Sequence, residues 1–204
     1  MSFEATAGFR IYPRYLDPEA QARLVIEIQT CLQASPLYRP VTPGGKQMSV
    51  EMTNLGPLGW CTSASGYAYQ DRHPGNGQPW PDIPRSLFDI WSEVGDREVP
   101  PDACLVNVYG SKARMGLHQD RDEADFQFPV VSVSLGDTGL FRIGGPERKD
   151  PTRSVRLASG DVCVLRGPAR LAYHGIDRIL PGSSRVWPWG GRVNLTLRRA
   201  RPGP

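Results

Sequence analysis

The sequence is poor in the residues that hold structural metals and disulfides. Among 204 residues there are three histidines and four cysteines, and no two cysteines are spaced as a C-x-x-C pair. A thiolate zinc site is therefore not expected. The cysteines stand among small or apolar neighbours, so we expect buried free thiols; they are Cys31, Cys61, Cys104 and Cys163.

Long apolar runs are also missing. No segment approaches the roughly 20 apolar residues that a membrane-spanning helix needs. The N-terminal MSFEATAGFR lacks the basic and then apolar pattern of a signal peptide. We therefore expect a cytoplasmic protein without a membrane partner. A net charge of +3 is too small to indicate a polyanionic partner, but it does not repel one.

Turn-forming residues are abundant instead. The 22 glycines and 20 prolines favour short strands and many turns over a helical bundle. Asp17 as N-cap, Pro18 at the first position and the break at Ser35-Pro36 predict one helix, and a second short helix is expected over 84–95. From Cys104 onward, seven runs rich in β-branched residues alternate with turns, which predicts a double-sheet sandwich or jelly roll with helices on one face. These runs are CLVNVY, PVVSVSL, LFRIGG, SVRLAS, DVCVLRG, LAYHGI and RVNLTLRR.

Two of the three histidines belong to a pattern that suits a metal. His118 and Asp120 project the same way from an extended chain, and His174 lies at the end of a later strand. Two histidines and one carboxylate are the facial triad of non-haem Fe(II) oxygenases, although zinc hydrolases can use the same ligand types. On the last strand, Arg192 and Arg198 share one polar face. Because arginine binds carboxylates in fork geometry, this face suits an oxoacid cosubstrate and favours iron.

These residues lie in a longer stretch that resembles a known family. NVYGSKARMGLHQDRDEADFQFPVVSVSLG, with YHGI and RVNLTLR, closely resembles the AlkB dealkylases, which are 2-oxoglutarate- and Fe(II)-dependent dioxygenases. The resemblance continues upstream through MTNLGPLGW, GYAY, PWPDIP and PDACLVN, and covers about residues 50–200. One departure is Leu165, at a position where these proteins often have tryptophan.

The resemblance implies an α+β, mostly β fold with a double-stranded β-helix (jelly-roll) core, N-terminal helices and a nucleotide-recognition flap. Within one compact domain we expect an arm and helix over 1–40, the flap and a supporting helix over 41–103, and the core over 104–204. The implied activity is oxidative demethylation of 1-methyladenine and 3-methylcytosine in DNA, mainly single-stranded, and in RNA. It uses Fe(II), O₂ and 2-oxoglutarate, and releases formaldehyde, succinate and CO₂. A monomer is expected.

The resemblance also assigns roles to residues of this sequence. The implied iron ligands are His118, Asp120 and His174. The implied 2-oxoglutarate contacts are Asn107, Tyr109, Arg192 and Asn194, with Arg198 as a catalytic residue beside the iron and the cosubstrate. For the damaged base, Trp60 would stack on the flipped ring opposite His118, and Asp122 would face the exocyclic nitrogen. Tyr67 and Arg148 would contact the nucleic-acid backbone or the base pocket.

Other readings remain open. The enzyme could instead act on tRNA, a protein or a small molecule. It could also be an inactive nucleic-acid-binding module, or a zinc hydrolase. Outside the site we expect a solvent-exposed Glu123, an exposed turn at His73, and a frayed tail that contains Arg199 and Arg201.

Overall fold

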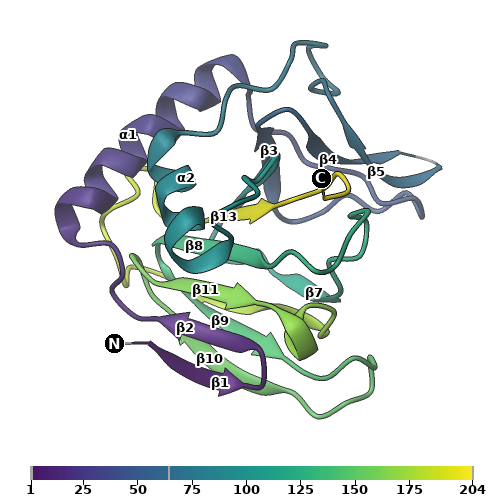
Figure 1. Cartoon of the computed structure of the whole chain (residues 1–204). Helices are drawn as coiled ribbons and strands as arrows, with labels where there is room; N and C mark the ends of the chain where they lie inside the picture. Colours follow the sequence, from purple (N-terminus) through teal and green to yellow (C-terminus); the bar gives the residue numbers. More distant parts are fainter. Residues whose placement is uncertain (1, 64, 204) are drawn as a thin grey trace.

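The computed structural model of the chain describes residues 2–63 and 65–203. Its largest element is a seven-stranded antiparallel sheet in the order β1-β2-β11-β8-β13-β6-β3. A four-stranded antiparallel sheet has the order β10-β9-β12-β7, and β4 and β5 form a separate hairpin (Figure 1). The strands of the large sheet are β1 (Phe3–Thr6), β2 (Phe9–Tyr12), β3 (Glu51–Leu55), β6 (Ala103–Tyr109), β8 (Val130–Gly136), β11 (Val162–Leu165) and β13 (Arg192–Arg198).

The smaller sheet and the hairpin complete the β structure. The smaller sheet consists of β7 (Met115–His118), β9 (Thr138–Ile143), β10 (Arg153–Leu157) and β12 (His174–Leu180). The hairpin joins β4 (Gly59–Ser63) to β5 (Gly66–Gln70), and in Figure 1 it projects to one side of the sheets. Two antiparallel sheets packed face to face are the arrangement of a jelly roll, so the predicted fold class is confirmed.

The helices cover one face of the large sheet. Helix α1 (Pro18–Ala34) begins where Asp17 accepts a hydrogen bond from the Ala20 N–H at 2.7 Å, and it ends before Ser35, as predicted. The second helical segment is α2 (Arg85–Ile90), which continues into a π-helical turn, η1 (Trp91–Gly95). A short 3₁₀ turn, η2 (Gly167–Ala169), follows β11. No helix in the described part of the chain is long and apolar enough to cross a membrane.

The large sheet therefore separates two hydrophobic cores. The first packs α1 and α2 against side chains such as Val193, Leu195 and Leu197 of β13. The second lies between the sheets and includes Phe9, which stacks on Phe141 with ring centroids 5.3 Å apart. Alternation along β13 then turns its polar residues toward the smaller sheet, into the space between the two layers.

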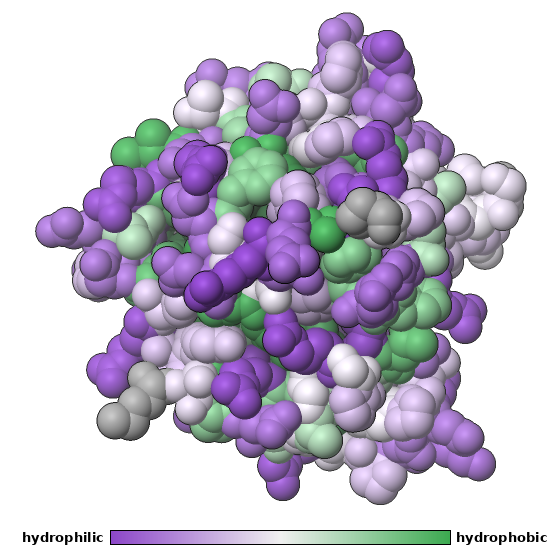
Figure 2. Space-filling model, in the orientation of Figure 1, coloured by the Kyte–Doolittle hydropathy of each residue, from purple (hydrophilic) through white to green (hydrophobic). Residues whose placement is uncertain are grey.

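The state of the cysteines and the polarity of the surface are those of an ordinary globular protein. Three cysteines are buried, Cys31 is half-buried, and all four are free thiols, as expected. The face seen in Figure 2 is mostly hydrophilic, and its hydrophobic areas are small and separated.

Candidate active site

A cavity of about 390 Å³ opens between the two sheets, beneath the β4–β5 hairpin. Its walls come from both sheets, from the hairpin and from the loop after β7, and it brings together every site residue that the sequence analysis singled out. These are Trp60, Tyr67, Asn107, Tyr109, His118, Asp120, Asp122, Arg148, His174, Arg192, Asn194 and Arg198.

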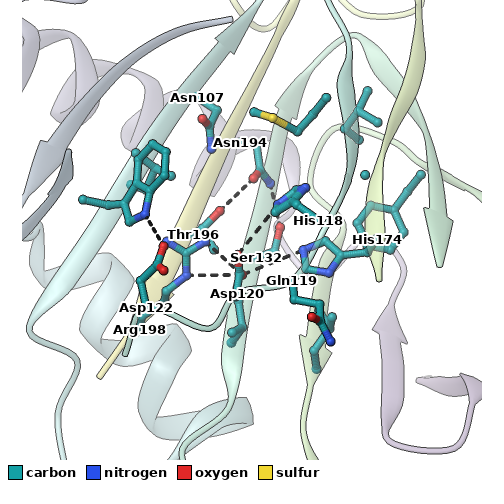
Figure 3. Close-up of a pocket in the computed structure, with 18 of the residues that line it drawn as sticks. Asn107, His118, Gln119, Asp120, Asp122, Ser132, His174, Asn194, Thr196 and Arg198 are labelled. Atoms are coloured by element: carbon teal, nitrogen blue, oxygen red, sulfur yellow. Dashed lines mark hydrogen bonds and ion pairs between the residues drawn. The ribbon is translucent and has the colours of Figure 1, made fainter. Parts of the chain in front are cut away.

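The three expected metal ligands meet in this cavity (Figure 3). His118 ends β7 and His174 begins β12, and the two are direct cross-strand neighbours in the smaller sheet. Asp120 follows two residues after β7. One potential ligand atom from each residue lies within 4.8 Å of the others. The Nε2 atoms of His118 and His174 lie 3.7 and 3.8 Å from the Asp120 carboxylate, a spacing that leaves room for a metal ion between them.

Hydrogen bonds fix the orientation of both imidazoles. Nδ1 of His118 lies 2.9 Å from the carbonyl oxygen of Gly116, and Nδ1 of His174 lies 2.9 Å from that of Ala172. A carbonyl oxygen can only accept, so each Nδ1 carries the proton and each Nε2 presents its lone pair to the centre of the triad. Burial lowers the pKa of His174 to about 4, which keeps this ring neutral and able to bind a metal near neutral pH.

Arg198 keeps the third ligand ionised. Its Nη2 lies 2.9 Å from Oδ2 of Asp120, and both side chains are buried. Burial alone would raise the pKa of Asp120, but the nearby guanidinium of Arg198 brings it well below its ordinary value. The carboxylate is thus present as an anion although it is buried, as a metal ligand must be.

A second group of polar side chains lies deeper, between β13 and β9. Arg192 has no exposed surface; its Nη1 donates to the Leu157 carbonyl and its Nη2 to the Ser134 hydroxyl. Its Nε has no hydrogen-bond partner among the described residues, and neither does Oδ1 of buried Asn107. Buried polar atoms are rarely left unpaired, so both atoms indicate a polar ligand in this part of the cavity.

Tyr109 and Asn194 complete this polar pocket. Burial raises the pKa of Tyr109 to about 12, so its hydroxyl stays protonated and can donate a hydrogen bond. Asn194 donates to the Ser132 hydroxyl at 2.6 Å and accepts from Thr196 at 2.9 Å. A dicarboxylate with one end on Arg192 and the other toward the triad fits this donor set, and three protein ligands leave metal positions open for it.

The mouth of the cavity carries the residues expected to bind a base. Trp60 of β4 stacks on Tyr67 of β5, with ring centroids 5.1 Å apart and 17° between the planes. The Trp60 indole N–H donates to Oδ2 of Asp122 at 2.7 Å, a bond drawn in Figure 3. Arg148 donates to the Leu117 carbonyl and lies over the Tyr173 ring. Aromatic rings and a carboxylate thus line the same cavity as the triad.

Several residues that support the site were not predicted from the sequence. Glu123 was expected in solvent, but its side chain is 1% exposed and pairs with Arg170 and Arg198. Gln119 donates from Nε2 to the carbonyls of Pro146 and Leu171, which holds the loop between the first two ligands. Paired charges and amides of this kind look like ordinary polar residues in a sequence, because their partners are distant along the chain.

Other expectations outside the triad were also wrong. His73 is 5% exposed: Nε2 lies 2.8 Å from the Pro36 carbonyl, and Nδ1 accepts from the Gly75 N–H. The segment with Arg199 and Arg201 is held in place and not frayed. Asp102 forms an ion pair with Arg199 and accepts a hydrogen bond from the backbone N–H of Arg201. Leu165 is buried on β11 and lines the cavity with aliphatic surface.

Comparisons with known proteins agree with this geometry. The family model described as the 2OG-Fe(II) oxygenase superfamily matches residues 8–198. The chain is 63% identical over 194 residues to the alpha-ketoglutarate-dependent dioxygenase AlkB homolog of Caulobacter vibrioides, covering 95% of this chain and 88% of that protein. It is 42% identical over 198 residues to the alpha-ketoglutarate-dependent dioxygenase AlkB of Escherichia coli, covering 95% and 91%. The solved structure of OsALKBH1 matches with a TM-score of 0.85 and 31% identity over 98% of this chain and 100% of that chain.

Proposed function

The chain belongs to the AlkB family of the 2OG-Fe(II) oxygenase superfamily, and from this premise we propose that it oxidatively demethylates 1-methyladenine and 3-methylcytosine in nucleic acid. DNA, mainly single-stranded, is the main substrate and RNA a second one. Membership removes the zinc-hydrolase reading, because the reaction of the superfamily uses Fe(II) and 2-oxoglutarate. The enzyme works as a monomer in the cytoplasm.

The lesion explains why oxidation is needed. The C–N bond to the methyl group does not break by acid or base at neutral pH. Bound Fe(II), 2-oxoglutarate and O₂ supply the oxidation, in which the methyl group becomes hydroxymethyl while 2-oxoglutarate becomes succinate and CO₂. The hydroxymethyl group then leaves as formaldehyde and the normal base remains.

Different residues of the cavity would bind the iron and the cosubstrate. His118, Asp120 and His174 would hold the iron, with their tautomers and charge set by the Gly116 and Ala172 carbonyls and by Arg198. Arg192 would take the distal carboxylate of 2-oxoglutarate on its unpaired Nε. The polar pocket would also contact the cosubstrate through Asn107, Tyr109 and Asn194.

One observation carries the choice of a nucleobase as substrate. Trp60, Tyr67 and Asp122 lie at the mouth of the cavity that contains the triad. A base must leave its stack to reach an enclosed site, and an aromatic plane recovers about 1–3 kcal/mol of stacking per base. Asp122 favours a cationic methylated base, and the base N–H would replace the Trp60 N–H that now bonds to it.

The test compares methylated oligomers. Single-stranded DNA with one 1-methyladenine or 3-methylcytosine, DNA with an uncharged methylated base, and the matching RNA are incubated with Fe(II), ascorbate and 2-oxoglutarate. We expect the cationic lesions to react faster, and Asp122→Ala to reduce this preference. Equal turnover of charged and neutral lesions by both proteins would defeat the role of Asp122. Succinate formation without loss of any methyl group would instead indicate tRNA, a protein or a small molecule as substrate.

A further inference from the structure

Behind Arg198 lies a buried network around Glu123, a residue to which the reaction described above gives no role. It joins Glu123 to Tyr69, Arg170 and Arg198. The Tyr69 hydroxyl donates to Oε1 of Glu123 at 2.6 Å, and Nη2 of Arg170 donates to Oε2 at 3.0 Å. Nε of Arg198 lies 3.4 Å from Oε1. Both oxygens of a carboxylate that is almost fully buried are thus occupied.

The network continues to the metal ligand. Arg198 pairs with Glu123 on one side and with Oδ2 of Asp120 at 2.9 Å on the other. Arg170 bonds to Glu123 and also donates from Nη1 to the backbone carbonyl of Asp120 at 2.7 Å. Two arginines and two carboxylates therefore balance in a buried site, where an unpaired charge is strongly destabilising.

At its other end the network reaches the hairpin. Tyr69 of β5 is the direct cross-strand neighbour of Trp60 in β4, so the two side chains share one face of the hairpin. Trp60 bonds to Asp122 and Tyr69 bonds to Glu123, two successive acids of the loop that follows the ligand Asp120. The Trp60 bond is exposed and is the one that an incoming base would replace, whereas the Tyr69 bond is partly buried.

We propose that Glu123 is a positioning residue that couples docking of the β4–β5 hairpin to the orientation of Asp120. Tyr69 connects the hairpin to Glu123, and Arg198 and Arg170 connect Glu123 to Asp120. Binding at the metal site then favours the docked hairpin, and the docked hairpin favours metal binding, because a coupling between two sites is reciprocal. The inference rests on the proposed function only in taking the hairpin as the flap that holds the base.

The test measures this coupling without any substrate. Hydrogen exchange of peptides covering β4 and β5 is followed with and without Co(II), in wild type and in Tyr69→Phe, which removes only the hydroxyl. Tyr12→Phe removes the same group, a hydroxyl, from β2 near the opposite edge of the large sheet, and is the matched control. Co(II) affinity is measured by titration for these three proteins and for Glu123→Gln.

We expect Co(II) to slow exchange in the hairpin about fivefold or more in wild type and Tyr12→Phe, the scale of a typical coupling. In Tyr69→Phe, exchange should be faster and no longer respond to Co(II), although Co(II) still binds. Glu123→Gln, if it folds by circular dichroism, should lose the response and also bind Co(II) more weakly. A response that persists in Tyr69→Phe, or that is absent from wild type, would overturn the proposal. Demethylation of oligomers is measured separately. If the methylated oligomers are not substrates, the coupling between the hairpin and the metal site is still tested by hydrogen exchange.

Discussion

The buried guanidinium of Arg192 depends on a glycine in the opposite sheet. A Cβ atom at Gly139 would lie 2.9 Å from Nε of Arg192 and 3.0 Å from its Cδ. Gly139 therefore provides the space in which the expected carboxylate receptor lies.

Gly139→Ala should displace Arg192 and raise the KM for 2-oxoglutarate about tenfold, the scale of one lost bond to a charged group, with a smaller change in kcat. Gly44→Ala is the control, because a Cβ there meets no atom within 4 Å. Succinate formation over a range of 2-oxoglutarate concentrations measures both parameters. An unchanged KM in Gly139→Ala would show that Arg192 does not bind the cosubstrate.

At the scale of residues, the meeting of His118, Asp120 and His174 could be predicted, but the groups that support them could not. His118 and Asp120 stand two residues apart beside a strand, and His174 stands at a later strand; this short pattern indicates a metal site. Glu123 lies in the acidic stretch DRDEAD, where an exposed acid is the usual case. Its partner Arg170 is 47 residues away, and only the folded chain brings the two together.

Among the elements, the β4–β5 hairpin depends on one side chain of β3. Asn54 is fully buried. Its Oδ1 accepts from the backbone N–H of Trp60 and its Nδ2 donates to the backbone carbonyl of Trp60, both at 3.0 Å. This pair of bonds fixes the backbone that carries the stacking ring.

Asn54→Ala should loosen Trp60 and raise the KM for a methylated oligomer about tenfold, whereas Asn54→Asp, which keeps the acceptor, should have a smaller effect. The KM for 2-oxoglutarate should stay close to wild type in both variants. Steady-state kinetics with each substrate varied in turn gives the comparison. A larger effect on 2-oxoglutarate than on the oligomer would contradict this role.

The bounds of elements could be predicted where local signals are strong. Asp17, Pro18 and Ser35 set both ends of α1, and the β-branched runs gave the large strands after residue 103. β3 (EMTNL) and β7 (MGLH) were missed because polar residues and a glycine interrupt their pattern. β12 begins only at His174 and continues to Leu180, beyond the predicted run, because pairing with β9 extends the strand through two charged residues.

For the whole molecule, the large sheet is assembled from distant segments. The N-terminal hairpin β1–β2 joins β11, and β3 joins β6, so residues before 104 complete the sheet that carries the cavity. No local pattern encodes these pairings, and the sequence predicted only an arm at the N-terminus.

Phe9 joins the N-terminal hairpin to both sheets, since it has no exposed surface and stacks on Phe141. Phe9→Ala should lower the free energy of unfolding by about 3–5 kcal/mol, as is usual for a buried phenylalanine. Phe3→Ala, at a side chain that is 51% exposed, should change it far less. Urea unfolding followed by tryptophan fluorescence measures both. Similar values for the two variants would mean that the hairpin adds little to the fold.

The most direct test of the enzyme follows a single-stranded DNA oligomer with one 1-methyladenine by mass spectrometry. Wild type and His118→Ala are each supplied with Fe(II), ascorbate, O₂ and 2-oxoglutarate. We predict that wild type removes one methyl group with formation of formaldehyde and succinate, and that His118→Ala forms none of these products. An unchanged oligomer without succinate in the wild-type reaction would contradict the assignment of the iron site itself.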